Sequence, residues 1–269
     1  MELEIVRANP AGNITIFVMN PPESSKRAEA ARALMADPVY KAEQVGFVLP
    51  PSAHSGNWRL EMAGGEFCAN AGRSFGLLAA AKNGLSGRHT LFIETSGMAK
   101  PLPVHIDTEA QSAEIEIPAP LSRIEIALDA SFPAGNSGPP GIPVFKFEGI
   151  SHAIVPNMPP DEELVRFLIS KTNIADALGV MFYDSEKCYM QPVVWTRAID
   201  TLVFESSCGS GSAALGAWAA WNTDDTELNM DIAQPGGVIT VQVLKHAGKF
   251  ERLSISGKVS FSETLRYRC

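Results

Sequence analysis

The sequence predicts an α+β fold of two pseudo-symmetric halves, each a curved, mostly antiparallel sheet wrapped around one central helix. The first observation behind this prediction is an internal repeat at an offset of 140 residues, in which Cys68 and Cys208 each precede one glycine by eight residues and another by 29. The second is that the segment after each cysteine is apolar on all sides, which is typical of a helix buried inside a sheet. The third is the series of short, strand-like segments around those two helices.

Alternation and turn residues define the elements of the first half, residues 1–128. Asn9-Pro10-Ala11-Gly12 predicts a turn between two alternating segments, and Asn83-Gly84 is typical of the end of a helix. In chain order, we expect strands at 3–7 and 13–19, a helix at 26–35, strands at 44–49 and 57–62, a helix at 68–82, and strands at 90–94, 103–106 and 113–117.

Residues 128–143 collect Pro, Gly, Ser and Asn, which predicts a linker or surface loop. The second half, residues 129–269, resumes the strand signals and contains the more apolar of the two central helices. In chain order, we expect strands at 144–147 and 152–155, a helix at 161–170, strands near 179–183, 189–195 and 201–204, a helix at 208–221, and strands near 229–232, 238–244, 253–256 and 258–262.

The composition excludes several classes of function. Hydrophobic residues make up 45% of the chain and charged residues 19%, so a sizeable core can be buried. A net charge of -8 and the lack of a basic stripe argue against binding of nucleic acid. The N-terminus does not follow the signal-peptide pattern and no apolar run is long enough for a membrane span, so we expect a cytoplasmic protein. The cysteine and histidine spacings predict neither a disulfide framework nor a metal site.

Cys68 and Cys208 are predicted to be reactive thiols. Each opens a stretch of small residues that is typical of a helix start. A helix N-terminus carries free N–H groups and a partial positive charge, and both favour a thiolate. Cys188 and Cys269 lie in no such context, so we expect them to be ordinary cysteines.

Two such thiols suit the chemistry of an amino-acid α-carbon. This carbon is a very weak acid, and its carbanion is stabilised when the neighbouring carboxylate accepts hydrogen bonds from helix N-termini. Racemisation needs a base on one face and an acid on the other, and a thiolate and a thiol can exchange these roles. The sequence therefore predicts an amino-acid racemase that uses neither a cofactor nor a metal.

These motifs resemble those of the diaminopimelate epimerase superfamily of cofactor-independent, two-cysteine racemases. Residues 68–73 resemble its C-G-N-G-x-R motif, residues 208–211 its C-G-[ST]-G motif, and Pro235-Gly236-Gly237 its P-G-G turn. Gly12-Asn13 resembles its substrate-binding Gly-Asn. The resemblance implies the family fold, with the site between the two halves. It implies substrate contacts at Asn13, Ala69, Asn70, His152, Gly209 and Ser210.

Within this superfamily, the chain is more similar to the histidine racemases of staphylopine-type metallophore pathways. The shared segments are 9–13, 43–47, 65–68, 205–211 and 234–237. By this resemblance Asn13 and Glu43 bind the substrate. A carboxylate at Glu43 could accept a hydrogen bond from an imidazole N–H, which agrees with histidine as the substrate. In the diaminopimelate enzymes a Glu-Arg pair lies just before the second cysteine, and its arginine grips the distal carboxylate. Here Asp200 stands eight residues before Cys208 and the nearest upstream arginine, Arg197, is out of register, which argues against a substrate with two amino-acid heads.

Several alternatives stay open at this point. Asn70 could cap its helix rather than bind a carboxylate, and His152 could be a hydrogen-bonded core residue. The enzyme could be an epimerase or racemase of another amino acid, resembling the diaminopimelate or proline enzymes, or a hydroxyproline dehydratase. A protein of the same fold could also bind an amino acid without turnover. The expected partner is a small amino-acid substrate, and a homodimer is left open.

Overall fold

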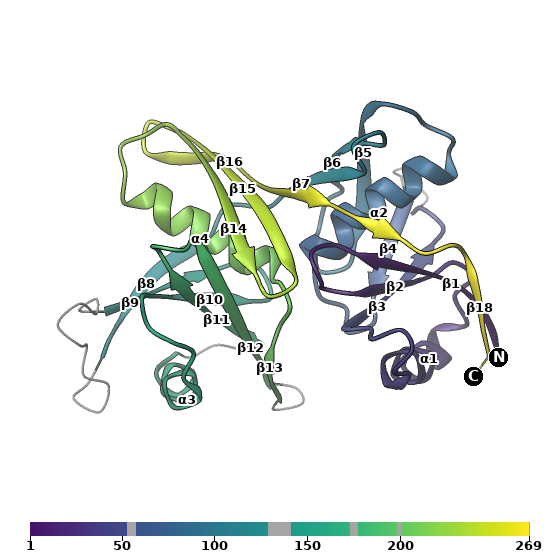
Figure 1. The fold of residues 1–269 in the computed structure, drawn as a ribbon, viewed down its shortest axis with the longest axis horizontal. Coiled ribbons are helices and arrows are strands. Elements are labelled where there is room, and N and C mark those ends of the chain that lie inside the picture. The colour runs from purple at the N-terminus through teal and green to yellow at the C-terminus, as the bar shows by residue number, and fades with distance from the viewer. Residues whose placement is uncertain (53–57, 129–140, 173–176, 198–200, 269) are drawn as a thin grey trace. The chain divides into compact units, whose positions relative to one another are not determined.

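The computed structural model describes residues 1–52, 58–128, 141–172, 177–197 and 201–268. The chain divides into two compact units, Met1–Glu116 with Ser256–Cys269, and Ile117–Ile255, whose elements Figure 1 shows. From the sequence, a division is expected between residues 128 and 129, with the C-terminal residues in the second half. They lie in the first unit because β18 (Leu265–Arg268) pairs with β1 (Glu2–Asn9).

The first unit is a mixed sheet with two helices. Its other elements in chain order are β2 (Thr15–Val18), α1 (Ser24–Ala36), β3 (Gln44–Leu49), β4 (Trp58–Met62), α2 (Ala69–Lys82), β5 (Arg88–Thr95), β6 (Leu102–Asp107), β7 (Ser112–Glu116) and β17 (Ser260–Phe261). Strands β2 and β3 pair in parallel, as do β4 and β5, whereas β1–β2, β3–β4, β5–β6 and β6–β7 are antiparallel. Parallel neighbours need a crossover, and α1 and α2 supply the two crossovers.

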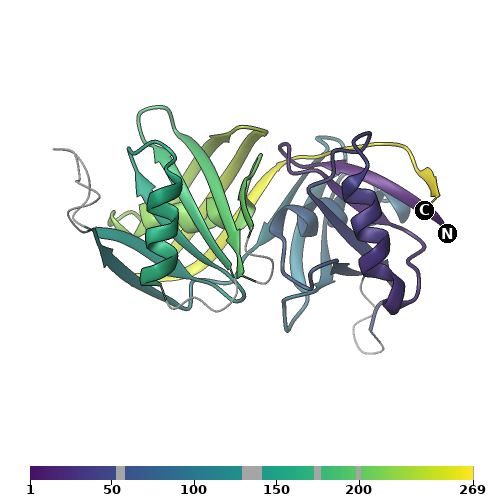
Figure 2. The same cartoon turned by 90° about the horizontal axis from the view of Figure 1, so that it is seen from below.

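Strand β2 is covered on both faces. All four of its residues are buried, which is the expected pattern for a strand between two layers. Ile16 and Val18 join a core with Leu34 of α1. Phe17 points the other way and packs against Phe75 of α2, with the ring centroids 5.7 Å apart. Figure 2 shows α1 lying across the strands of its own unit.

The second unit has the same kinds of element. In chain order they are β8 (Ser122–Ala127), β9 (Gly141–Lys146), β10 (Ser151–Pro156), α3 (Glu162–Lys171), β11 (Ala177–Asp184), β12 (Tyr189–Thr196), β13 (Thr201–Phe204), α4 (Gly209–Trp221), β14 (Glu227–Gln234), β15 (Gly237–His246) and the first residues of β16 (Lys249–Lys258). Strands β10 and β11 pair in parallel, as do β12 and β14. The buried face of α3, with Leu164, Val165 and Leu168, packs in a core with residues of β9 to β12.

The order of pairings repeats between the units. Along the chain, β2, α1, β3, β4, α2 and β5 correspond to β10, α3, β11, β12, α4 and β14, with β13 added before α4. The second and third strands of each set are antiparallel, and the other two pairings are parallel. The prediction of an α and β fold with an internal repeat is confirmed at this level.

Helices α2 and α4 are buried, as their composition predicts. Every residue from Ala69 to Ala80 is buried. Helix α2 packs against β4 to β7, and α4 against β10, β11, β14 and β15. A Cβ atom at Gly76 would lie 2.6 Å from Cγ1 of Val104, and one at Gly216 would meet Cγ1 of Val241. The repeated glycine eight residues after each cysteine therefore allows the close approach of helix and strand.

Three differences from the predicted elements concern sheet edges. Strand β8 lies in a segment for which no element was predicted, and so does β18. Residues 141–143, assigned to a loop, begin β9, while residues 129–140 of that loop lie outside the described residues. Strand β8 is mostly exposed and pairs with β9, and β18 pairs with β1 at the other end of the chain. Among the described residues, no helix combines the length and apolar character needed to cross a membrane.

Candidate active site

Cys68 and Cys208 occupy the same position in the two units, the N-cap of the buried helix. Both have extended backbones, with φ and ψ of -122° and 111° at Cys68 and -126° and 112° at Cys208. Each Sγ accepts a hydrogen bond of 3.4 Å from the backbone N–H three residues later, at Ala71 or Gly211. Sulfur thus fills a place usually taken by an oxygen of Ser, Thr, Asp or Asn. The positive end of each helix dipole favours the ionised form of that sulfur.

The turn after β5 holds the segment that leads into Cys68. Ser96 Oγ donates a 2.7 Å hydrogen bond to the carbonyl of Glu66. Gly97 follows with φ of +73°, and a Cβ atom there would overlap the backbone N of Phe67. Only glycine fits this approach, which explains the second repeated glycine in this half.

The corresponding turn after β14 holds Cys208. The N–H of Gly236 donates to the carbonyl of Ser206 at 2.8 Å. Gln234 accepts a 2.9 Å hydrogen bond from the N–H of Cys208 through Oε1, and its Nε2 donates to Ser212 Oγ at 3.0 Å. Gln234 therefore fixes both the cap residue and the first turn of α4.

A chain of hydrogen bonds joins three of the predicted substrate-binding residues in the first unit. Glu43 Oε2 accepts from Asn13 Nδ2 at 2.7 Å. Asn13 Oδ1 accepts from Asn70 Nδ2 at 3.4 Å and from Gln44 Nε2 at 2.6 Å. Asn13 and Asn70 are buried, whereas Glu43 is exposed. The structure thus brings a carboxylate and two amides to the first turn of α2.

Arg73 extends this chain into the interior. Its side chain is fully buried, and its Nε donates to Asn70 Oδ1 at 3.2 Å. Its Nη1 donates to the carbonyl of Gly257 at 2.9 Å, while Nη2 is buried with no hydrogen-bond partner among the described residues. Burial lowers the pKa of Arg73 to about 10, and the charge of the Cys68 sulfur partly opposes this shift. The guanidinium is therefore still a cation at neutral pH.

In the second unit, Cys208, Ser210 and His152 form a contiguous group. His152 Nε2 lies 3.0 Å from Ser210 Oγ, which in turn lies 3.7 Å from Cys208 Sγ. His152 is fully buried on β10, with its ring edge-on to Phe147 at a centroid distance of 5.9 Å. The contact with Ser210 shows that His152 has a polar partner near the thiol.

Burial shifts the protonation of both titratable groups in this cluster. It lowers the pKa of His152 to about 3, so the imidazole is neutral. It also raises the pKa of Cys208 well above its usual value, and the carboxylate of Glu205 raises it further. Hydrogen bonds from the N–H of Gly211 and from Ser210 act in the opposite direction, but burial is the largest cause. Cys208 is therefore a protonated thiol at neutral pH.

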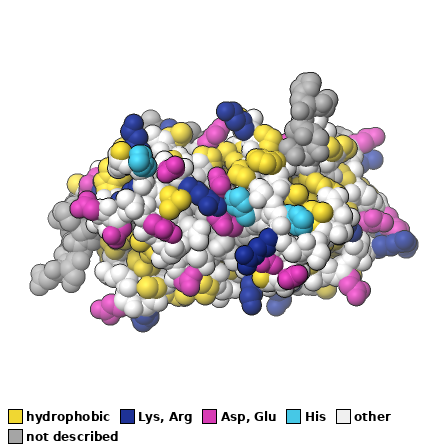
Figure 3. Space-filling model, turned by 90° about the horizontal axis from the view of Figure 1, so that it is seen from above, with side chains coloured by type: hydrophobic (Ala, Val, Ile, Leu, Met, Phe, Trp, Pro, Cys, Tyr) yellow, Lys and Arg dark blue, Asp and Glu magenta, His cyan; other side chains and the backbone are white. Residues whose placement is uncertain are grey.

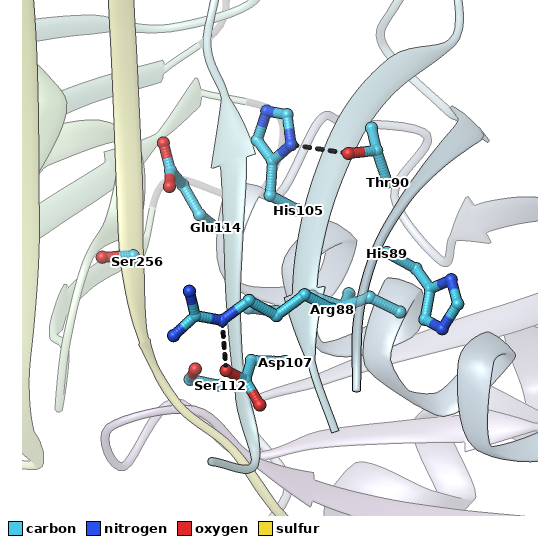
Figure 4. Close-up of a pocket in the computed structure, with 10 residues that line it drawn as sticks. Arg88, His89, Thr90, His105, Asp107, Ser112, Glu114 and Ser256 are labelled. Atoms are coloured by element: carbon cyan, nitrogen blue, oxygen red, sulfur yellow. Dashed lines mark hydrogen bonds and ion pairs between the residues drawn. The ribbon is translucent and has the colours of Figure 1, made fainter. Parts of the chain in front are cut away.

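Two surface hollows lie elsewhere. One, of about 520 Å³, is lined in the first unit by polar residues of β5 to β7, and the other, of about 630 Å³, lies beside β8 in the second. Figure 4 shows the first, where Arg88 points to Asp107 and His105 to Thr90. Neither hollow contains a predicted site residue. Acidic and basic side chains are interspersed over the face that Figure 3 shows. No group of three or more His, Cys, Asp or Glu side chains suited to a metal ion occurs in the described part of the chain.

The sequence matches the family model described as "Histidine racemase CntK N-terminal domain" over residues 2–264. The chain belongs to this histidine racemase family. A histidine racemase of Fusobacterium nucleatum is 33% identical over 228 residues, which cover 80% of each chain. The histidine racemase of Staphylococcus aureus is 27% identical over 265 residues, covering 96% of this chain and 94% of that one. The chain is thus an isomerase, and the comparisons support an amino-acid racemase.

This member of the histidine racemase family has a fold similar to those of several solved structures. A PhzF-family phenazine biosynthesis protein from Enterococcus faecalis matches with a TM-score of 0.64 and 14% identity, covering 100% of both chains. A hydroxyproline epimerase from Agrobacterium vitis, solved with trans-4-hydroxy-L-proline, matches with a TM-score of 0.64 and 12% identity, covering 98% of this chain and 92% of that one. At these identities the likeness concerns the mixed α and β fold alone.

The predicted site residues of this histidine racemase family member fall into one group in each unit. In the first unit, hydrogen bonds join Glu43, Asn13 and Asn70 at the first turn of α2, which begins at Ala69 and is capped by Cys68. In the second unit, Ser210 contacts both His152 and Cys208 at the first turn of α4, which begins at Gly209. Cys68 is the residue that caps α2, so the side chain of Asn70 is not the cap. Asn70 instead contacts Asn13 and Arg73.

Sequence reasoning missed three residues with roles in these groups. Gln44 holds Asn13, Arg73 holds Asn70, and Gln234 holds Cys208. Arg73 and Gln234 lie within segments that carry the family resemblance, so their positions in those motifs could have marked them as candidate site residues. Their hydrogen-bond partners could not be read from the sequence, because only the fold brings Gln234 to a residue 26 positions earlier.

Proposed function

We propose that this protein interconverts L- and D-histidine, with Cys68 and Cys208 as the acid and base on opposite faces of the α-carbon. The observation that carries the proposal is the matching placement of both sulfurs at the N-terminus of a buried helix. Buried structural cysteines have no need of that position, whereas a reacting thiolate is stabilised there.

The reaction consists of two coupled proton transfers. A thiolate removes the α-proton, so that an S–H bond forms as the C–H bond breaks and the electron pair delocalises into the carboxylate. The opposite thiol then donates its proton to the other face, which inverts the α-carbon. In this proposal the first N–H groups of α2 and α4, from Ala69 and Asn70 and from Gly209 and Ser210, bind the substrate carboxylate and stabilise the charge that develops on it.

The side chain of the substrate is assigned from the group around Glu43. This carboxylate is exposed, yet Asn13 fixes it by a hydrogen bond of 2.7 Å. A fixed carboxylate can accept a hydrogen bond from an imidazole N–H and pairs more strongly with imidazolium. The names of the relatives support the same substrate. A role in a metallophore pathway stays a prediction from the resemblance.

The test is a racemisation assay with histidine, arginine, lysine, diaminopimelate and proline as substrates, in which the change in optical rotation is the readout. We expect activity with histidine above all others. Cys68→Ser and Cys208→Ser should each lower the rate in both directions by about 1,000-fold or more, because each removes the group that serves one face. Cys188→Ser is the matched control, since Cys188 is an exposed cysteine outside both groups, and it should keep the wild-type rate.

Two results would contradict the proposal. Wild-type rates in Cys68→Ser or Cys208→Ser would remove that sulfur from the reaction. If the protein inverts proline or diaminopimelate but not histidine, the proposal of a racemase stands and the assignment of histidine as its substrate is refuted.

A further inference from the structure

The repeat that makes the two thiols equivalent in position does not make them equivalent in charge. At the offset of 140 residues, Arg73 of α2 corresponds to Ala213 of α4. Both side chains are fully buried. A cation thus lies within the first turns of the helix that Cys68 caps, and a methyl group takes its place behind Cys208.

The charge of Arg73 lacks a carboxylate to balance it within the described residues. Its hydrogen-bond acceptors are the amide oxygen of Asn70 and the carbonyls of Gly257 and Lys258, which are all neutral. An unpaired buried cation is costly, and the cost falls when an anion lies nearby. The bond from Nε to Asn70 directs the guanidinium back toward the N-terminus of α2, where Cys68 is the group that can become an anion.

In the part of the chain that the structure describes, β4, β6 and β7 turn no charged side chain toward α2. The residues that β4, β6 and β7 turn toward α2 are apolar, among them Leu60, Val104 and Ile115. Their charged residues alternate onto the other face, where Figure 4 shows Asp107 and Glu114. The remaining charged and titratable groups lie in three places: on the outward face are Arg59, Glu61, Arg88, Glu94, His105 and Glu116, at the C-terminal end of α2 are His89 and Lys82, and exposed near its start are Glu43, Glu66 and Lys258.

Around Cys208 the electrostatic effects have the opposite sign. Glu205 lies three residues before it and acts against a second negative charge. His152, which β10 turns toward the thiol, is neutral because burial lowers its pKa to about 3. Strand β11 contributes Met181 and β14 contributes Gln234, and neither carries a charge. Within the described residues, no cation balances a thiolate at Cys208.

We infer that in the resting protein Cys68 is the thiolate and Cys208 the thiol, and that Arg73 is the positioning residue that sets this order. The inference rests on the proposed function, in which these two sulfurs form the acid and base pair. Each turnover from the resting state moves one proton onto Cys68 and one from Cys208. The pair then returns to the favoured state by exchanging protons with solvent.

The experiment measures the ionisation of each thiol separately in the full-length protein. Iodoacetamide reacts with thiolates, so its rate at each cysteine, followed by mass spectrometry of the peptides between about pH 5 and pH 10, gives a midpoint for each sulfur. Midpoints are compared rather than rates, because Cys68 is half-buried and Cys208 buried and their access to the reagent differs. We expect the midpoint of Cys68 to lie at least about one pH unit below that of Cys208. Equal midpoints, or a lower one at Cys208, would overturn the inference.

Substitution of Arg73 tests the source of the difference. In Arg73→Gln, the Cys68 midpoint should rise by about one pH unit or more, while the Cys208 midpoint stays unchanged. Arg73→Lys should restore most of the shift because it retains the charge. Arg59→Gln, which removes an exposed cation from the outward face of β4, should leave both midpoints in place. An unchanged Cys68 midpoint in folded Arg73→Gln would refute the role of Arg73.

The outcomes separate this inference from the proposed function. If histidine is racemised through both cysteines but the midpoints coincide, the inference fails and the function stands. If the midpoints differ as expected but no amino acid is racemised, the function fails. Should Arg73→Gln not fold, the comparison of midpoints in the wild-type protein still decides the ionisation state.

Discussion

At the scale of the residue, burial sets the protonation state of Cys208 and of the neighbouring His152. His152 is the clearest case, since its imidazole is fully buried and its Nε2 lies 3.0 Å from Ser210 Oγ. The sequence predicts His152 and both cysteines as site residues, the cysteines because short motifs carry them. It could not show that Arg73 and Gln234 complete their surroundings, because those contacts depend on strands distant in the chain.

The buried imidazole predicts a dependence of stability on pH. The pKa of His152 falls from 6.5 to about 3 on folding, so the unfolded chain binds a proton there more readily than the folded one. The contribution is fully present above pH 6.5 and is lost as the pH falls from 6.5 toward 3. Between pH 6.5 and 4.5 it amounts to about 2–3 kcal/mol of the free energy of unfolding.

Urea denaturation at both pH values measures this contribution. His152→Gln should lose less stability on acidification than the wild type, by that amount. His246→Gln, at an exposed histidine, should follow the wild type. If His152→Gln and the wild type lose equal stability, the imidazole is not held neutral by burial.

At the scale of the element, the two central helices follow from composition, whereas the edge strands do not. A run from Ala69 to Ala80 with almost no polar face has to be buried on all sides, and it is. Strand β8 is mostly exposed and β18 has only four residues, so neither shows a strong pattern. Their strand character depends on their partners, β9 and β1, which the sequence does not specify.

Packing of α2 on β6 predicts the effect of a single methyl group. Gly76→Ala should destabilise the protein by about 1–2 kcal/mol, because the new Cβ would lie 2.6 Å from Cγ1 of Val104, whose branched side chain is stiff. In a Val104→Ala background the same change should cost less, because the contact with Cγ1 is gone and alanine has the higher helix propensity, while Cβ of residue 104 and Cδ1 of Ile93 still lie 3.0 and 3.1 Å from the new atom. Thermal or urea unfolding of the four proteins gives both values, and an equal loss of stability in both backgrounds would contradict this packing.

At the scale of the whole molecule, one supersecondary arrangement occurs twice, with its own cysteine-capped helix each time. The sequence revealed the duplication because the cysteine, the glycine that packs on a strand and the glycine of the following turn recur at the same spacing. The two compact units divide the chain elsewhere than between residues 128 and 129, because residues 256–269 return to the first unit through pairing between the two ends of the chain. The duplication positions two thiols alike. In our inference, the residues around them make Cys68 the thiolate that acts as base and Cys208 the thiol that acts as acid.

The most direct measurement of the central claim follows the fate of the α-proton when L-histidine reacts in D₂O. With a separate sulfur for each face, Cys68 and Cys208, D-histidine formed early should carry deuterium at its α-carbon, while recovered L-histidine still carries protium. Mass spectrometry after chiral separation distinguishes these species. Early D-histidine that retains protium, or L-histidine that gains deuterium before inversion, would show that a single base serves both faces and would contradict the two-thiol account.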